Sequence, residues 1–267
     1  MDRFPKRIVC LTEEPTEVLY ALGQQHRIVG ISGFTVRPPQ ARKEKPKVSA
    51  FLSAKIDAIT ALKPDLVIGF SDIQADIART LIASGLNVWI SNHRSVEGIF
   101  EYCLQLACLV GARAEGEVLL AQMQQQVDIA LAAAASLTHR PRVYFEEWDE
   151  PRISAIQWVA ELIRIAGGDD LFPDRANASL AKDRILPDDS EIIARDPELI
   201  LGSWCGKKFR PEHLIARPGF AAISAVRNNQ LFEVKSPIIL QPGPAALLAG
   251  LPELSRRILA CGRLVPL

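Results

Sequence analysis

The sequence has few of the residues that most catalytic and metal-binding sites need. It contains only four histidines, and no two of its five cysteines have Cys-x-x-Cys spacing. Zinc and manganese sites need clustered His and carboxylate ligands, so we predict no metal site. A dinucleotide fingerprint, a phosphate-binding loop and a nucleophile with a base in recognisable context are also missing, so we predict no catalytic residue and no enzyme. The histidines are His26, His93, His139 and His213.

The chain also lacks net charge and long hydrophobic runs. Its 31 Lys and Arg residues balance 31 Asp and Glu residues, and no long block carries one sign. This balance removes the electrostatic attraction that nucleic acids and anionic membranes exert on basic proteins. No apolar run reaches the roughly 20 residues that span a bilayer. We therefore expect no nucleic-acid partner and no membrane insertion. We also expect a monomer.

A signal peptide is not visible at the start of the chain. The residues before Arg7 lead directly into a predicted strand, without an apolar signal core or a lipobox cysteine. The cysteines are typical of buried free thiols, which fit a reducing compartment. Both features predict a cytoplasmic location for the chain as written. The cysteines are Cys10, Cys103, Cys108, Cys205 and Cys261.

The most informative pattern is an internal repeat, in which residues 57–69 resemble residues 190–202. Each copy predicts a short amphipathic helix, a proline that ends it, and an apolar strand that ends at glycine. Two copies so far apart predict two lobes of similar build with a ligand cleft between them. The residues that recur are Ile59, Ala61, Pro64, Leu66 and Gly69, as Ile192, Ala194, Pro197, Leu199 and Gly202.

Short apolar strands alternate with helices on both sides of residues 113–138, which predicts an α/β fold with parallel sheets. Residues 113–138 hold strong helix formers and no proline, so they predict one helix of about 35 Å. A helix of that length would be a rigid strut. We therefore predict an N-terminal lobe at 1–112, a linking helix at 113–138 and a C-terminal lobe at 139–267.

Ligands of parallel sheets bind beyond the carboxyl ends of the strands, which nominates the loops that follow each predicted strand. Trp148 and Trp204 could offer flat aromatic faces, or could merely seal strand ends. The acidic loop residues could accept hydrogen bonds from a ligand or bind a cation, or be solvated. Lys207 could hold an anionic group, or be solvated. The candidates are Glu13, Glu14, Phe34, Ser71, Asp72, His93, Arg94, Glu146, Glu147, Trp148, Trp204, Cys205 and Lys207.

Several segments, in a characteristic order, resemble the substrate-binding proteins of ABC importers for cobalamin and iron–siderophore complexes, the class III periplasmic binding proteins. The resemblance covers nearly the whole chain. The matching segments start at Pro15-Thr-Glu-Val-Leu-Tyr, Ala61-Leu-Lys-Pro-Asp-Leu, Trp158-Val-Ala-Glu-Leu, Arg217-Pro-Gly-Phe and Gln241-Pro-Gly-Pro.

This resemblance implies two Rossmann-like lobes joined by one long helix, with the ligand in the cleft between them. It further implies an aromatic ligand contact at Phe51 and a periplasmic or otherwise extracytoplasmic location. Asp57 and Glu191 would contact arginines of an ABC permease dimer, although both acids could instead complement the dipoles of the helices that they open.

We therefore expect reversible binding of a bulky metal chelate or a corrinoid, such as cobalamin, by the substrate-binding component of an ABC importer. The chelate would be the transported ligand, and no cofactor would be covalently bound. The alternative is a cytosolic carrier, or an enzyme, that uses this fold for a smaller polar ligand.

Overall fold

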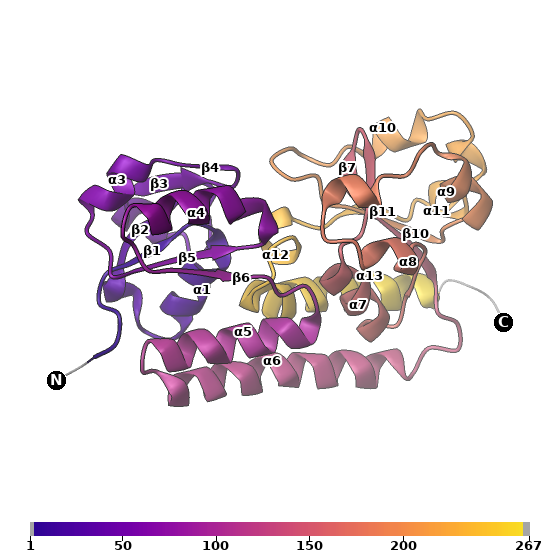
Figure 1. Ribbon diagram of the computed structural model, residues 1–267. Helices are drawn as coiled ribbons and strands as arrows, with labels where there is room; N and C mark the ends of the chain where they lie inside the picture. Colours follow the sequence, from indigo (N-terminus) through magenta and orange to yellow (C-terminus); the bar gives the residue numbers. More distant parts are fainter. Residues whose placement is uncertain (1–2, 264–267) are drawn as a thin grey trace. The chain divides into compact units, whose positions relative to one another are not determined.

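The computed structural model describes residues 3–263, which form two compact α/β units (Figure 1). Within the described residues, the first unit holds the chain up to His93, Glu97–Gln122 and Pro242–Pro244. The second unit holds Arg94–Val96, Met123–Gln241 and the chain from Ala245 onward. The predicted α/β class with parallel-rich sheets is confirmed.

A six-stranded sheet in the order β4-β3-β2-β1-β5-β6 forms the centre of the first unit. All neighbouring strands are parallel except β3 and β4, which form a tight antiparallel hairpin. Every residue of β1 and β5 is buried, as expected for central parallel strands that are covered on both faces. The strands are β1 (Ile8–Cys10), β2 (Ile28–Ser32), β3 (Lys47–Ala50), β4 (Ser53–Ala54), β5 (Leu66–Phe70) and β6 (Val88–Ser91).

The helices of the first unit connect consecutive strands of this sheet. Side chains from α3 and α4, including Ile59 and Leu81, pack with strand residues such as Val9 and Val67 in one core cluster. The helical segments are α1 (Glu13–Ala21), η1 (Gln25–Arg27), α2 (Ala41–Glu44), α3 (Ile56–Ala61), η2 (Asp72–Gln74), α4 (Ala75–Ala83) and α5 (Val96–Leu109).

The second unit has a five-stranded sheet in the order β11-β10-β7-β8, with β9 paired to the start of β7. Strand β7 is parallel to β9 and β10, whereas β7 and β8 form an antiparallel hairpin. The sheet covers a core that includes Tyr144, Ile200 and Phe220. The strands are β7 (Arg142–Asp149), β8 (Arg152–Ser154), β9 (Asp169–Asp170), β10 (Leu199–Gly202) and β11 (Leu231–Glu233).

Short helical segments make up most of the connections in the second unit, where, among the described segments that follow β7, α7 and α13 are the ones longer than six residues. They are α7 (Gln157–Ile165), α8 (Pro173–Ala176), η3 (Ala181–Arg184), α9 (Ser190–Arg195), α10 (Pro211–Ile215), η4 (Phe220–Ala222), α11 (Ser224–Arg227), α12 (Ser236–Ile239), η5 (Ala246–Gly250) and α13 (Leu251–Gly262).

The long helix expected over 113–138 is present as α6 (Arg113–Ala134), a single run of 22 residues that ends four residues earlier than predicted. Its residues up to Gln122 belong to the first unit, and those from Met123 belong to the second. The division into separate parts at 1–112, 113–138 and 139–267 stays a prediction. No helix within residues 3–263 is both long enough and apolar enough to cross a membrane.

The glycines at the ends of the two repeat copies have one structural reason in common. Gly69 is the penultimate residue of β5 and Gly202 is the last residue of β10, and in each case a later side chain lies directly over the glycine. A Cβ atom on Gly69 would overlap the amide of Gln74. A Cβ atom on Gly202 would overlap the ring of Phe209. The repeated glycine therefore makes room for the loop that follows each strand.

We predict that Gly202→Ala lowers the free energy of unfolding by about 1–3 kcal/mol, because the buried Phe209 ring must move to accommodate the methyl group. Urea denaturation would measure the change. In a Phe209→Leu background the same substitution should cost clearly less, because the clash is then relieved. Equal costs in the two backgrounds would contradict this explanation of the glycine.

Candidate ligand-binding surfaces

An apolar surface lies at the carboxyl edge of the first unit's sheet. Phe34 follows β2, Leu52 sits in the β3–β4 turn, and Ile73 follows β5. Their side chains are 57%, 71% and 41% exposed. Single exposed apolar residues are common on proteins, but several along one sheet edge are typical of a binding surface. The sequence analysis selected Phe34 but missed Leu52 and Ile73.

The side chain of Gln74 connects the end of β5 to the β3–β4 turn by hydrogen bonds. Its buried amide accepts a hydrogen bond from Phe70 N (3.1 Å) and donates one to Phe51 O (3.0 Å). Ser71 is buried with a left-handed backbone, and its Oγ lies 2.9 Å from an oxygen of the exposed Asp72. The partly buried Phe51 and the exposed Leu52 are thereby held at a defined place beside β5. No sequence motif marked Gln74 for this role.

Glu13 and Glu14 are buried in the first turn of α1, with exposed fractions of 7% and 2%. Thr12 Oγ1 donates a hydrogen bond to Glu14 Oε1 at 2.5 Å. Burial, assisted by the neighbouring charge of Glu13, raises the pKa of Glu14 to about 8, and burial also raises the pKa of Glu13. Gly243 packs against Glu14, because a Cβ there would lie 2.9 Å from Glu14 Cβ. Neither acid is presented to solvent as an open anion.

His93 is held on both sides of its ring. Pro242 O can only accept a hydrogen bond, so His93 Nε2 donates to it (2.7 Å) and Nδ1 accepts from Ser91 Oγ (2.7 Å). The ring stacks on Tyr102, with 4.4 Å between centroids. Neither nitrogen is free to ligate a metal in this arrangement. Arg94, which belongs to the second unit, donates to Ser179 O at 3.1 Å.

Glu146 is the most densely bonded side chain at the carboxyl end of β7, and it is completely buried. Arg217 contacts its two oxygens at 2.6 and 3.0 Å. Tyr144 Oη and Trp204 Nε1 donate further hydrogen bonds at 3.0 and 3.1 Å. With both oxygens used inside the protein, Glu146 holds the fold together and has no capacity left for a ligand. Sequence analysis placed Arg217 in a family segment but did not identify it as the partner.

Glu147 is similarly engaged. The guanidinium of Arg184, which is 1% exposed, contacts its carboxylate at 2.6 and 3.0 Å and also donates to Ser154 O. The pair attaches the η3 segment to the β7–β8 hairpin. Of the acidic residues expected to form a ligand-binding cluster, Glu146 and Glu147 thus each face an internal arginine.

The two tryptophans expected to bind ligand differ in exposure. Trp204 is 2% exposed, and its ring packs edge-on against Phe209 with 5.0 Å between centroids. Trp148 is partly exposed and donates from Nε1 to Glu150 O at 2.8 Å. Lys207 Nζ lies over both indole rings. Cys205, in the turn between Trp204 and Lys207, is exposed. The structure thus brings Trp148, Trp204 and Lys207 together.

The two acids expected to contact a permease differ in their surroundings. Asp57 is exposed in the first turn of α3 and has no ion-pair partner among the described residues. Glu191 is partly buried between Arg175 (3.0 Å) and Arg195 (2.6 Å). The exposed acid nearest the start of α9 is Asp188, whose pKa is lowered by hydrogen bonds from Ser190.

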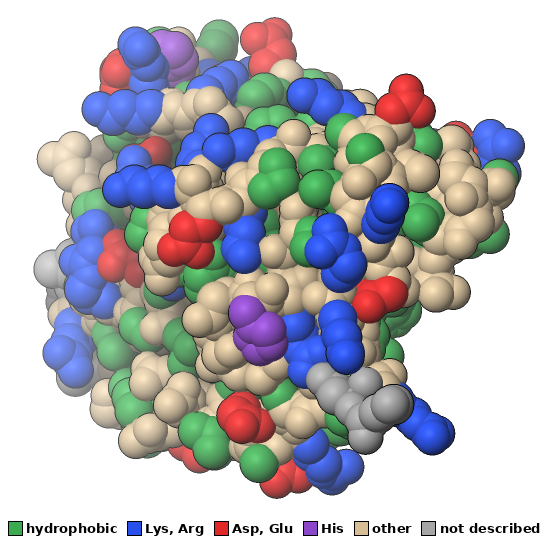
Figure 2. All heavy atoms as spheres, turned by 90° about the vertical axis from the view of Figure 1, so that its left-hand side faces the viewer, with side chains coloured by type: hydrophobic (Ala, Val, Ile, Leu, Met, Phe, Trp, Pro, Cys, Tyr) green, Lys and Arg blue, Asp and Glu red, His purple; other side chains and the backbone are tan. Residues whose placement is uncertain are grey.

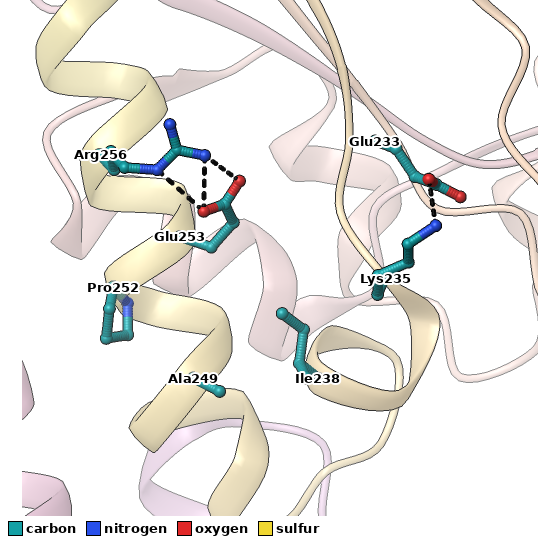
Figure 3. Close-up of a pocket in the computed structure, with 7 residues that line it drawn as sticks. All are labelled: Glu233, Lys235, Ile238, Ala249, Pro252, Glu253 and Arg256. Atoms are coloured by element: carbon teal, nitrogen blue, oxygen red, sulfur yellow. Dashed lines mark hydrogen bonds and ion pairs between the residues drawn. The ribbon is translucent and has the colours of Figure 1, made fainter. Parts of the chain in front are cut away.

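A surface pocket of about 340 Å³ lies beside β11 in the second unit (Figure 3). Ile238, Ala249 and Pro252 supply its apolar wall. Its charged groups face one another, since Glu253 binds Arg256 at 2.6–3.0 Å and Glu233 pairs with Lys235. These internal pairs use the charges that a ligand would need. Across residues 3–263, no three His, Cys, Asp or Glu residues are grouped so that they could hold a metal ion.

Charges of both signs are mixed over the face drawn in Figure 2, which looks at the molecule from the left-hand side of Figure 1. Lys and Arg side chains lie among Asp, Glu and hydrophobic side chains there. This mixing agrees with the formal net charge of zero. The drawn face therefore has no continuous field of one sign that would attract a polyanion.

Comparison with known proteins assigns the family. A family model described as periplasmic binding protein matches residues 8–238, so the chain belongs to the periplasmic binding protein family. The chain is 25% identical over 252 residues to the vitamin B12-binding protein of Vibrio parahaemolyticus, covering 91% of this chain and 86% of that protein. It is 24% identical over 267 residues to YvrC, an ABC transporter substrate-binding lipoprotein of Bacillus subtilis, covering 95% and 80%.

Solved structures agree on the fold. The periplasmic heme-binding protein RhuT from Roseiflexus superposes with a TM-score of 0.81 at 24% identity, covering 96% of this chain and 99% of that one. The family and the listed relatives are binding proteins and not enzymes, so the chain is a binding protein. The family resemblance and the absence of enzymatic function expected from sequence are confirmed by these matches.

The buried Glu14 generates a pH prediction. Its carboxyl has a pKa near 8 in the folded protein and near 4.5 when unfolded, so the folded state holds its proton more tightly. Stability from this group is complete below about pH 4.5 and is lost as the pH rises towards 8, by at most about 1.4 kcal/mol per pH unit. Glu14→Gln should flatten this part of the pH profile in urea denaturation. The exposed Glu101→Gln is the control and should leave the profile unchanged.

Proposed function

We propose that the chain is the substrate-binding component of an ABC importer and reversibly binds a bulky, largely apolar metal chelate of the corrinoid class. The exposed Phe34, Leu52 and Ile73 at the carboxyl edge of one sheet carry this proposal. A small polar ligand would have no use for so much exposed apolar surface, whereas a macrocycle would bury it.

The side chains at these edges favour a chelate whose metal is already fully coordinated. Heme iron is commonly held by His, Tyr, Met or Cys. His93 has both ring nitrogens engaged, and Tyr102 and Tyr144 are buried. Cys205 is exposed at the edge of the second sheet, and the hemin titration described below tests whether it ligates iron. A corrinoid brings its own lower ligand or water, and so needs none of these groups. The name of the Vibrio parahaemolyticus relative supports this class, while RhuT supports only the fold. No observation favours the cytosolic carrier or enzyme.

We further propose that acidic residues on the two units contact basic residues of the permease, outside the cytoplasm. Asp57 is the contact on the first unit, because its carboxylate is exposed and unpaired among the described residues. On the second unit, Glu191 would first have to leave Arg175 and Arg195. The exposed Asp188 requires no such rearrangement and is the stronger candidate.

Ligand binding can be tested by tryptophan fluorescence. Cyanocobalamin or cobinamide, corrected for its own absorbance, should quench the wild-type protein saturably at micromolar concentration, with hemin and a ferric siderophore as comparison ligands. Leu52→Asp should weaken binding about tenfold, because apolar contact is lost and a charge is desolvated. Ile82→Asp, at an exposed apolar position (59%) on α4 away from the strand ends, is the matched control. Saturable binding of hemin alone would contradict the corrinoid class.

Permease docking can be tested separately from binding. Asp57→Lys and Asp188→Lys should each abolish or strongly reduce uptake by the intact transporter while leaving ligand affinity unchanged, because like charges would meet at the interface. Asp76→Lys, on the exposed face of α4, should leave uptake unchanged. If Glu191→Lys reduces uptake and Asp188→Lys does not, the contact on the second unit is Glu191.

A further inference from the structure

The ammonium group of Lys207 is enclosed on three sides by other side chains of the second unit. Its Nζ lies 4.4 Å from the ring centroid of Trp148 and 5.1 Å from that of Trp204. Asp149 Oδ1 lies 2.5 Å from the same nitrogen. We call Trp148, Asp149 and Trp204 the aromatic cage. Two indole faces and one carboxylate are the groups that recognise an alkylammonium ion in proteins.

The walls of the cage are fixed independently of Lys207. Trp204 is held by its hydrogen bond to Glu146 and by the ring of Phe209. Trp148 is held by its hydrogen bond to Glu150 O. The Asp149 side chain is 14% exposed, and its Oδ1 accepts no well-directed hydrogen bond from the described residues. The cage therefore contains a nearly buried negative charge that needs a cation.

The occupant, by contrast, is attached through an exposed turn. Lys207 N donates to Trp204 O at 3.2 Å, and Gly206 between them has φ +79°, a left-handed conformation suited to glycine. This turn folds Lys207 back over the indole of Trp204. The Lys207 side chain remains 42% exposed. It can leave the cage by rotation about its own bonds, without disturbing the tryptophans.

We propose that the aromatic cage is a binding site for an alkylammonium group of a small-molecule ligand, and that Lys207 fills it until the ligand displaces it. A quaternary ammonium is less strongly hydrated than a lysine ammonium, so it loses less on entering between two indoles. This site takes an organic cation, a different class of ligand from the metal chelate, and it does not depend on the corrinoid proposal.

The test uses choline and its neutral isostere 3,3-dimethylbutan-1-ol, titrated into the full chain and followed by tryptophan fluorescence. Lys207→Ala should bind choline about tenfold more tightly than the wild type, because the competing ammonium is gone. It should bind choline about tenfold more tightly than the isostere, because only the charge differs. Lys208→Ala removes a neighbouring exposed lysine outside the cage and should behave as wild type.

Four results would overturn the proposal. Equal binding of choline and the isostere would mean that the cage binds through apolar contact and does not recognise the positive charge. No saturable response in Lys207→Ala would mean that the walls do not hold a cation by themselves. Binding by Lys207→Ala with none by the wild type would make Lys207 a permanent part of the structure. Lys207→Ala/Trp148→Leu should lose the choline response, and its retention would locate binding elsewhere.

Discussion

The carboxyl edge of the second unit's sheet depends on one buried ion pair, between Glu146 and Arg217. Glu146 is completely buried, and an ionised carboxylate in such a place is tolerated only when it is fully paired. Arg217, which follows α10, forms this ion pair with Glu146. Trp204 and Tyr144 donate the remaining hydrogen bonds to the carboxylate oxygens. Loss of one partner of a buried pair typically costs about 3–5 kcal/mol. The pair thus fixes the loop, the indole of Trp204 and, through them, one wall of the aromatic cage.

In the first unit, the loop after the corresponding strand is held in place by a neutral side chain instead of an ion pair. There the loop after β5 is fixed by a neutral amide, Gln74, which bonds to the backbone of Phe70 and Phe51. Glu14 is one of two neighbouring buried acids in this unit. Its raised pKa of about 8 keeps the carboxyl protonated below that pH, so that no unpaired charge is buried. Each unit nevertheless needs a glycine at the strand end, Gly69 or Gly202, over which the next loop can fold. The two repeat copies therefore share a glycine near the strand end that makes room for the next loop. The side chains that hold that loop in place differ between the two units.

These constraints separate the residues that build the surfaces from those that can meet a ligand. Most of the acids in the strand-end loops serve the fold, since Glu13, Glu14 and Glu146 are buried and Glu147 faces Arg184. The exposed strand-end residues include the apolar Phe34, Leu52 and Ile73 together with Asp72 in the first unit, and the second unit has the lysine-filled aromatic cage. These surfaces are the ones on which the two ligand proposals rest, a large apolar chelate in the first unit and an organic cation in the second.

The sequence by itself determined the α/β class, the repeat, the long helix and the family, because these follow from periodicity, helix stops and segment order that are local in the chain. It also located the loops that follow the strands, since strand ends can be read from apolar runs. Only the tertiary structure decided what each side chain does there. Whether Glu146 meets a ligand or an arginine depends on a residue 71 positions away, and whether Trp204 is a surface or a core residue depends on Phe209 folding over Gly202. Such pairings are set by packing between distant segments, and no local pattern encodes them.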